Sequence, residues 1–148
     1  MILPDFPAAL RTALERKTQG ISRNDAAERS AAISQTYRSG GGSQTIRGES
    51  DALAYALARM PATYAAVIAS LNALREVLPE FKPQTLLDVG AGPGTATWAA
   101  AQACESLNAF SAVDANPAVG TLGLDLIGGG PGVSGFRYTQ SEASAGVP

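Results

Sequence analysis

One segment of the sequence has residue types and a spacing that could bind a ligand. Residues 88–94 read Asp-Val-Gly-Ala-Gly-Pro-Gly, directly after a short apolar run and directly before a segment of helical composition. Glycines at a strand-to-helix turn let the backbone turn tightly, and they let a ligand reach the main chain because no Cβ stands in the way. The first N–H groups of the following helix would also face a bound ligand. Residues 88–94 are therefore the first candidate for a binding loop.

The spacing of the glycines separates the ligand classes. A phosphate-binding loop of the G-x-x-x-x-G-K-[ST] type needs a lysine, and no lysine lies near this segment. The dinucleotide fingerprint is G-x-G-x-x-G, whereas Thr95 stands here at the position of its last glycine. Asp88 precedes the first glycine by two residues and suits an ammonium group or hydroxyls better than a pyrophosphate, which it would repel. A purely structural tight turn, or a different nucleotide, is the alternative reading.

A second acidic residue, Asp114, ends the next apolar run of the chain. The pattern D-x-G-x-G-x-G resembles motif I of the class I methyltransferases that use S-adenosylmethionine. This resemblance implies that the loop lies against the methionine and ribose parts of that cofactor, and that the acid ending the second strand binds the ribose hydroxyls. The cofactor-binding residues so implied are Asp88, Gly90, Gly92, Gly94 and Asp114. The alternative for Asp114 is a helix N-cap, and no residue is assigned a catalytic role.

Composition excludes several kinds of site within these 148 residues. The absence of histidine rules out Ser-His-Asp and Cys-His nucleophiles and zinc sites that use imidazole. The single cysteine, Cys104, cannot form an intrachain disulfide or a CxxC metal knuckle, and its alanine-rich surroundings favour a buried filler. No metal site is therefore expected. The net charge of −2 gives no nucleic-acid footprint, so no DNA partner is expected either.

Aromatic and basic residues have simple structural interpretations. Tyr55, Tyr64 and Trp98 are expected to be core aromatics rather than base-stacking platforms. Four arginines fit solvated helix and loop positions, with an RNA-facing role as the alternative; these are Arg23, Arg29, Arg38 and Arg47. No window approaches 18 uninterrupted apolar residues, and residues 1–7 lack the pattern of a signal peptide. We therefore expect no membrane span and a cytoplasmic location.

The first 82 residues are predicted to be helical. Apolar spacing indicates two helices within residues 6–39, separated at Gly20. A third helix begins near Ser50, and we expect Pro61 to interrupt it and to start a fourth. The fourth helix has the clearest apolar stripe in the chain, made of Tyr64, Val67, Ile68, Leu71, Leu74, Val77 and Leu78.

From residue 83 the pattern changes to short apolar runs that alternate with helical segments. The expected strands are 86–89, 110–113 and 136–139. The expected helices are 95–104 and one that starts at Asn116-Pro117 and carries Leu122, Leu126 and Ile127 on its apolar face. This alternation is typical of a parallel, doubly wound sheet. The predicted fold class is α/β, with a helical N-terminal region at residues 1–82. Residues 83–148 would then form the first half of a Rossmann-like sheet, in the strand order 3-2-1.

Further stretches carry a closer resemblance than the loop alone. They are Tyr37–Gly40, Asp51–Tyr64 with its Arg-x-Pro-x-x-Tyr element, Leu86–Trp98 and Val113–Pro117. They resemble the bacterial branch of the ribosomal small-subunit methyltransferase-like family, whose mitochondrial members assist assembly of the small subunit of the mitochondrial ribosome. The resemblance implies a helical region before an S-adenosylmethionine-type domain, and the small ribosomal subunit or its RNA as partner.

The family also has a later cysteine cluster that binds an iron–sulfur centre, which Cys104 does not match. Such a centre is therefore expected only in a part beyond this sequence. A three-stranded half-sheet would leave the edge of its first strand open, so we expect the chain to be the front part of a protein about twice as long.

Three functions are compatible with these features. The leading hypothesis is an S-adenosylmethionine-dependent methyltransferase-like protein associated with the small ribosomal subunit or its RNA. The alternative is a non-catalytic assembly factor that uses the methyltransferase fold as a binding module, since the sequence has no acceptor-side Asn/Asp-Pro-Pro-aromatic run. A dinucleotide-dependent oxidoreductase is disfavoured by the spacing of the glycines.

Overall fold

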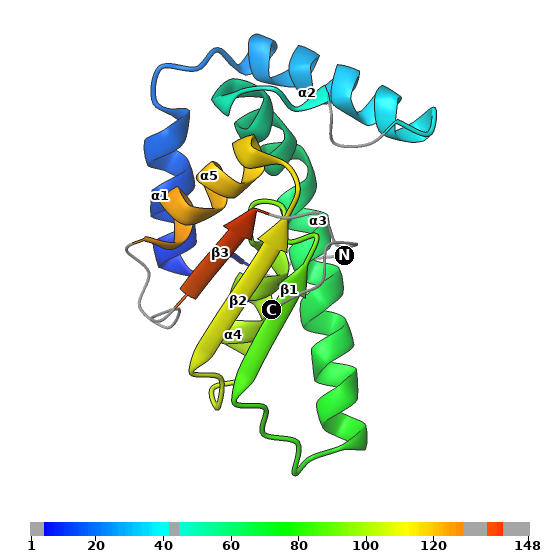
Figure 1. Cartoon of the computed structure of the whole chain (residues 1–148), viewed down its shortest axis with the longest axis vertical. Coiled ribbons are helices and arrows are strands. Elements are labelled where there is room, and N and C mark those ends of the chain that lie inside the picture. The colour runs from blue at the N-terminus through cyan, green and yellow to red at the C-terminus, as the bar shows by residue number, and fades with distance from the viewer. Residues whose placement is uncertain (1–4, 42–44, 129–135, 141–148) are drawn as a thin grey trace.

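The computed structural model describes residues 5–41, 45–128 and 136–140, in which five helices and three strands form. Figure 1 shows the three strands side by side, with α3 running along most of the length of the molecule. The elements in chain order are α1 (Ala8–Thr18), α2 (Arg23–Arg38), α3 (Glu49–Val77), β1 (Thr85–Val89), α4 (Thr95–Ala103), β2 (Ala109–Asp114), α5 (Pro117–Ile127) and β3 (Phe136–Gln140).

The three strands form one parallel sheet in which β2 lies between β1 and β3. The expected order 3-2-1 gives the same neighbours, counted from the opposite edge of the sheet. Val89 at the end of β1 lies opposite Val113, and Asp114 at the end of β2 lies opposite Gln140. The carboxyl ends of all three strands therefore lie at the same end of the sheet, directly beside the residues predicted to bind a ligand. The α/β class and the helical N-terminal region are confirmed.

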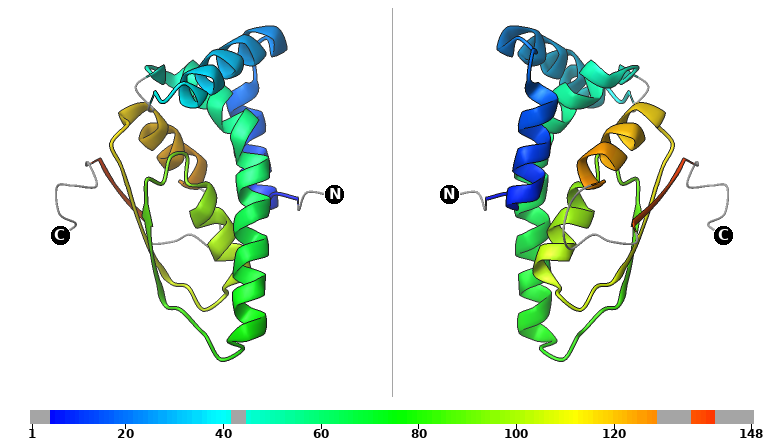
Figure 2. Two further views of the ribbon diagram at one scale, coloured as in Figure 1. Left: turned by 90° about the vertical axis from the view of Figure 1, so that its right-hand side faces the viewer. Right: turned by 90° about the vertical axis from the view of Figure 1, so that its left-hand side faces the viewer.

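The helices cover one face of the sheet. Figure 2 shows the sheet edge-on with the helices on one side of it. α4 and α5 pack directly on the strands, α3 packs on α4 and α5, α1 packs on α5, and α2 packs on α3. Phe110 and Ala112 point toward the helices and are buried, whereas Leu87 and Val89 of β1 point the other way and are 50% exposed.

The long helix α3 corrects the prediction of two helices divided at Pro61. One helix runs from Glu49 to Val77 with Pro61 inside it. Burial explains the difference, because Met60 and Tyr64 flank the proline and are both buried in the core. Packing on both sides therefore outweighs the local cost of a proline. The carbonyl that loses its N–H partner belongs to Leu57, an exposed residue that water can reach.

The second half of α3 is less buried than its apolar stripe predicts. Leu74 and Leu78 are exposed, and Val77 is 77% exposed. The helix is also long and apolar enough, by length and composition alone, to cross a membrane. A core helix passes the same test, and the buried residues of its first half, such as Leu53 and Tyr64, belong to the main core.

One hydrophobic core joins the helical region to the sheet. Tyr64 and Trp98 are buried in it, as predicted for core aromatics, and Phe6 contacts Tyr64 edge-on with ring centroids 5.2 Å apart. Cys104 is buried and free, which agrees with its interpretation as a filler. The core contains side chains from α1, α2, α3, α4, β2 and α5, so the α/β part shares its interior with the helical part.

One lysine links three helices at the surface of this core. Lys17 of α1 donates to Glu49 of α3 at 2.9 Å and to Asp125 of α5 at 2.6 Å. Both hydrogen bonds raise the pKa of Lys17 above its ordinary value, the one to Asp125 having the larger effect. The charge of Lys17 thus helps to hold the first helix against the last.

Candidate functional site

The glycine segment forms the turn between β1 and α4, as the sequence predicts. Gly90, Gly92 and Gly94 have φ values of 71°, 55° and 84°. These values lie in the left-handed region, which residues with a Cβ rarely adopt. A Cβ built at Gly90 or Gly92 would meet no atom within 4 Å. The loop therefore needs glycine for its backbone shape, and its main chain is open to an approaching ligand at these two positions.

The backbone of the loop is fastened to the end of β2. The N–H groups of Gly90 and Ala91 both donate to the carbonyl of Val113, at 2.8 and 3.1 Å. Within the loop, the N–H of Gly94 donates to the carbonyl of Ala91 at 2.9 Å. These bonds fix the turn relative to the neighbouring strand rather than leaving it attached only to β1 and α4.

Asp114 holds the middle of the loop. One carboxylate oxygen accepts from the N–H of Gly92, and the other accepts from the N–H of Asn116, each at 2.8 Å. The N-cap of α5 is Asn116, whose side chain accepts from Ala118 and Val119. The alternative in which Asp114 caps this helix is therefore wrong. Each oxygen of Asp114 has a further lone pair with which it can accept from a ligand.

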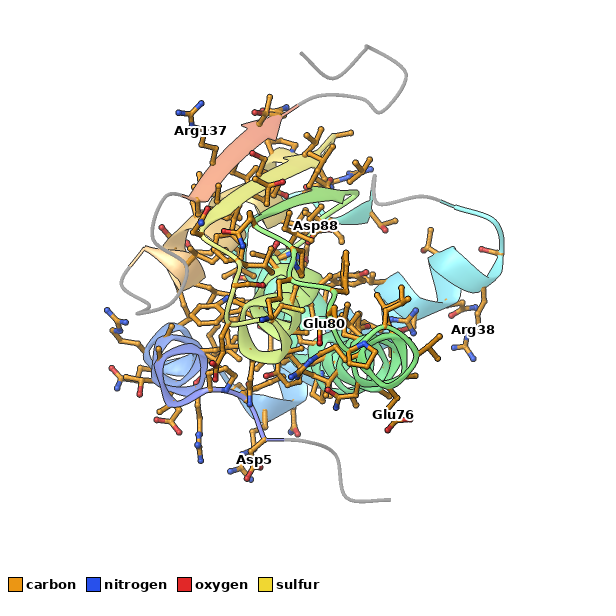
Figure 3. All side chains as sticks on the ribbon, turned by 90° about the horizontal axis from the view of Figure 1, so that it is seen from below. Asp5, Arg38, Glu76, Glu80, Asp88 and Arg137 are labelled. Carbon is orange, nitrogen blue, oxygen red and sulfur yellow. The ribbon has the colours of Figure 1, made fainter. Side chains whose placement is uncertain are left out.

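Asp88 lies on the side of β1 that faces the helices, and its position is labelled in Figure 3. Its carboxylate accepts from the hydroxyl of Thr97 at 2.9 Å and from the backbone N–H of the same residue. Burial raises the pKa of Asp88, the bonds from Thr97 lower it, and the charge of Asp114 raises it again; the net shift is upward. Two carboxylates thus lie close enough to interact at the ends of adjacent strands. A positively charged ligand would relieve this repulsion.

The hydrogen bonds of the loop argue against a phosphate ligand. Pro93 has no N–H, and the other four residues from Gly90 to Gly94 all donate within the protein. A phosphate-binding loop instead offers its backbone N–H groups to the anion. The two nearby carboxylates would also repel a phosphate. The site therefore suits a ligand with positive charge and hydroxyl groups.

Tyr138 is a site residue that the sequence did not reveal. It lies in β3, and its hydroxyl donates to the carbonyl of Gly92 at 2.8 Å. The two residues are separated by 46 positions in the chain. The sequence predicts a strand at this place but contains no local signal of the contact.

Two cavities bounded by described residues lie away from the loop. One, of about 600 Å³, runs along the middle of α3 and includes Arg59 and Val67. The other, of about 430 Å³, lies between the ends of α3 and α4 and includes Arg75 and Lys82. Neither includes a residue of the glycine loop, so the candidate site stands on the loop's own geometry.

One of the four arginines considered for RNA contact is occupied by ion pairs. Arg29 bonds to Asp25 at 3.2 Å and to Asp51 at 2.9 Å, which joins α2 to α3. The hydrogen bond to Asp51 is the largest cause of the raised pKa of Arg29. Arg29 therefore joins two helices at the surface, and Arg23, Arg38 and Arg47 are also exposed.

The glycine loop, Asp88, Asp114 and Tyr138 all lie in a region of the chain that matches a known protein family. Residues 49–145, from α3 through β3, match the sequence model of a family described as mitochondrial small ribosomal subunit Rsm22. Over 94 residues the chain is 39% identical to the human ribosome assembly protein METTL17, mitochondrial. The alignment covers 60% of this chain and 21% of that protein, so the chain spans about a fifth of the relative's length.

Proposed function

The chain belongs to the mitochondrial small ribosomal subunit Rsm22 family, and on this premise we propose that it is an S-adenosylmethionine-binding, methyltransferase-like protein of the small ribosomal subunit. The observation that carries the proposal is the glycine loop held by β2, with Asp88 and Asp114 beside it. The matched human relative is itself named a ribosome assembly protein.

The residues at the loop fit this cofactor. The open space at Gly90 and Gly92 lets the cofactor lie against the main chain. S-adenosylmethionine carries an ammonium and a sulfonium, and both would gain from the negative potential of Asp88 and Asp114. Each Asp114 oxygen is oriented by one backbone N–H and keeps a lone pair for a ribose hydroxyl.

When bound, the cofactor supplies an electrophilic methyl group for direct displacement. The contribution of this chain is to bind and orient. Asp114 fixes the loop and would hold the ribose, while the loop backbone would set the position of the methionine part. None of the described residues is assigned to deprotonate or bind the methyl acceptor.

We further propose that this sheet is the first half of a Rossmann-like methyltransferase sheet. No described strand pairs with the outer edge of β1, and the outward side chains of Leu87 and Val89 are 50% exposed. An additional strand beside β1 would cover this edge and place the loop at the switch point of the sheet, where open α/β sheets bind ligands.

The cofactor proposal is tested by calorimetry on the full-length protein with S-adenosylmethionine, S-adenosylhomocysteine and NADH. We expect binding of the first two and none of NADH. Binding of NADH alone, or of no ligand, would contradict the proposal.

The role of Asp114 needs a sharper comparison, because removing it also disturbs the loop. The wild type and Asp114→Asn are each titrated with S-adenosylmethionine and with its 2′-deoxyribose analogue. If Asp114 binds the ribose, loss of the 2′-hydroxyl weakens wild-type binding about five- to tenfold and weakens binding to the variant much less. Equal discrimination in both proteins would remove Asp114 from the ribose site.

Catalysis and assembly are separated by a different pair of measurements. A methyltransferase transfers radiolabelled methyl to small-subunit RNA, and the label is lost in a variant that no longer binds the cofactor. The second candidate, a non-catalytic assembly factor, has the support of the relative's name. It predicts cosedimentation with the small subunit but no cofactor-dependent label. The absence of both cosedimentation and label would contradict both functions.

A further inference from the structure

Two glycines in the interior of α5 have no explanation in the helix itself. Gly120 and Gly123 are both buried, and glycine at such positions weakens a helix relative to alanine. A Cβ built at Gly120 would lie 2.8 Å from Cε1 of Tyr138. A Cβ at Gly123 would lie 3.2 Å from Cε2 of the same ring. The two glycines therefore form a flat seat, one helical turn long, on which the ring of Tyr138 lies.

This seat directs the tyrosine hydroxyl at the glycine loop. The hydroxyl donates to the carbonyl of Gly92 at 2.8 Å. A Cβ at Gly123 would also lie 3.3 Å from that same carbonyl oxygen, so α5, Tyr138 and the loop meet at one point. Burial raises the pKa of Tyr138, and the charges of Asp114 and Asp88 raise it further, so the hydroxyl remains a proton donor at any ordinary pH.

Gly92 is consequently held on both sides. Its N–H donates to Asp114 and its carbonyl accepts from Tyr138, each at 2.8 Å. These two groups belong to consecutive peptide units, and a glycine with open space around it would otherwise let both rotate. Asp114 comes from the end of β2 and Tyr138 from β3, so two different strands set the two peptide planes.

We infer that Tyr138 is a positioning residue of the cofactor loop, which holds the Gly92 peptide in the orientation that binds the ligand. The inference rests on the proposed function for the identity of the ligand. It goes beyond that function by making the third strand part of the site. A loop already held in its bound shape loses less conformational entropy on binding, so Tyr138 raises affinity without touching the cofactor.

The central variant is Tyr138→Phe in the full-length protein. It keeps the ring on its glycine seat and removes only the hydroxyl. We expect affinity for S-adenosylmethionine to fall about fivefold, the factor that corresponds to a hydrogen bond of about 1 kcal/mol. Gly120→Ala is the second variant, because its Cβ would displace the ring while the hydroxyl remains. We expect it to weaken binding by a similar or larger factor.

Tyr64→Phe is the matched control. Tyr64 is a buried tyrosine whose hydroxyl donates to Gln102 of α4, away from the loop. It should alter thermal stability but leave cofactor affinity within about twofold of wild type. A purely structural role for Tyr138 predicts the same behaviour for Tyr138→Phe. Unchanged affinity in Tyr138→Phe would therefore overturn the inference.

Hydrogen exchange provides a readout that does not depend on the cofactor. Without ligand, the amide of Gly92 should exchange faster in Tyr138→Phe than in wild type or Tyr64→Phe. If the wild type binds no S-adenosylmethionine, the proposed function fails, and this exchange measurement alone decides whether Tyr138 holds the loop. Equal exchange of Gly92 in all three proteins would overturn the inference.

Discussion

Asp114 should stabilise the fold even when no ligand is bound. Its carboxylate accepts from the N–H groups of Gly92 and Asn116, each at 2.8 Å. Hydrogen bonds to a charged group contribute about 1.5–3 kcal/mol each, and water can replace part of this at a half-buried site. We therefore expect Asp114→Ala to lower the free energy of unfolding by about 2–4 kcal/mol. In a chain of this length the melting temperature should fall by roughly 5–15 °C.

The free energy of unfolding of Asp114→Asn should lie between those of the alanine variant and the wild type. The amide keeps one carbonyl oxygen that can accept one of the two N–H bonds, while its NH₂ group faces the other donor. We expect a loss of about 1–2 kcal/mol. Stability that decreases from wild type to the asparagine variant to the alanine variant indicates a carboxylate that accepts two hydrogen bonds.

The assay is thermal and urea unfolding of the three proteins without ligand. Asp125→Ala is the matched control, because Asp125 pairs with Lys17 at the surface and its side chain is 46% exposed. A pair of this kind contributes about 1 kcal/mol or less. If Asp114→Ala loses no more stability than Asp125→Ala, the carboxylate of Asp114 does not hold the loop.

Three further changes test other parts of the structure. Asp88→Asn should have a higher melting temperature than the wild type at neutral pH, because burial raises the pKa of Asp88 in the folded state and so penalises its charged form. This difference in melting temperature should disappear as the pH falls below 3.8, the ordinary pKa of the group. A variant that is less stable than the wild type at pH 7 would contradict this. Lys17→Met should cost about 1 kcal/mol at neutral pH. Because the pKa of Lys17 is raised, this contribution should persist up to its ordinary value of 10.5 and be lost as the pH rises further. Denaturation at neutral and at high pH measures it, and an equal cost at both would contradict this. Leu87→Lys should lower any concentration-dependent association of the 148-residue chain in sedimentation, since it places a charge on the exposed face of β1, next to the edge with which no described strand pairs. Unchanged association would show that this face is not involved.

The position of the glycine loop could be predicted from the sequence because it depends on local rules. Glycines between a strand and a helix fix a turn, and the ends of parallel strands meet at one edge. Asp88 and Asp114 therefore arrive beside the loop in the structure. Their hydrogen bonds could not be predicted, because the same residue type can cap a helix, hold a loop or bind a ligand. Only the geometry shows that Asn116 is the cap and that Asp114 accepts from Gly92.

In the helical region the predictions from local signals were wrong where tertiary packing decides the structure. Pro61 is a strong local signal for a helix boundary, and it is overruled by the burial of Met60 and Tyr64 on either side. The apolar stripe beyond Tyr64 has the right period, but only its first part packs against the core; its last residues, Leu74, Val77 and Leu78, are exposed because the described residues offer few partners there. The contacts of Tyr138 could not be predicted because they involve two helical glycines and a loop that are distant in the chain.

The helical region shares its core with the helices that flank the loop, although the sequence suggests a boundary at residue 82. α3 forms the layer on which α4 and α5 pack, and Tyr64 lies fully buried within it. A hydrogen-bonded chain also crosses the boundary, since Asn116 donates its side-chain amide to the carbonyl of Ile46 at 3.0 Å and its backbone N–H to Asp114.

Asp114 in turn holds Gly92, so the segment before α3 is connected to the loop through two side chains. A fragment that begins at residue 83 would expose the buried faces of α4 and α5 and lose this connection. We expect such a fragment to lack a cooperative unfolding transition, whereas residues 1–148 retain one. A fragment 83–148 that unfolds cooperatively and protects the Gly92 amide from exchange would show that the two regions are independent.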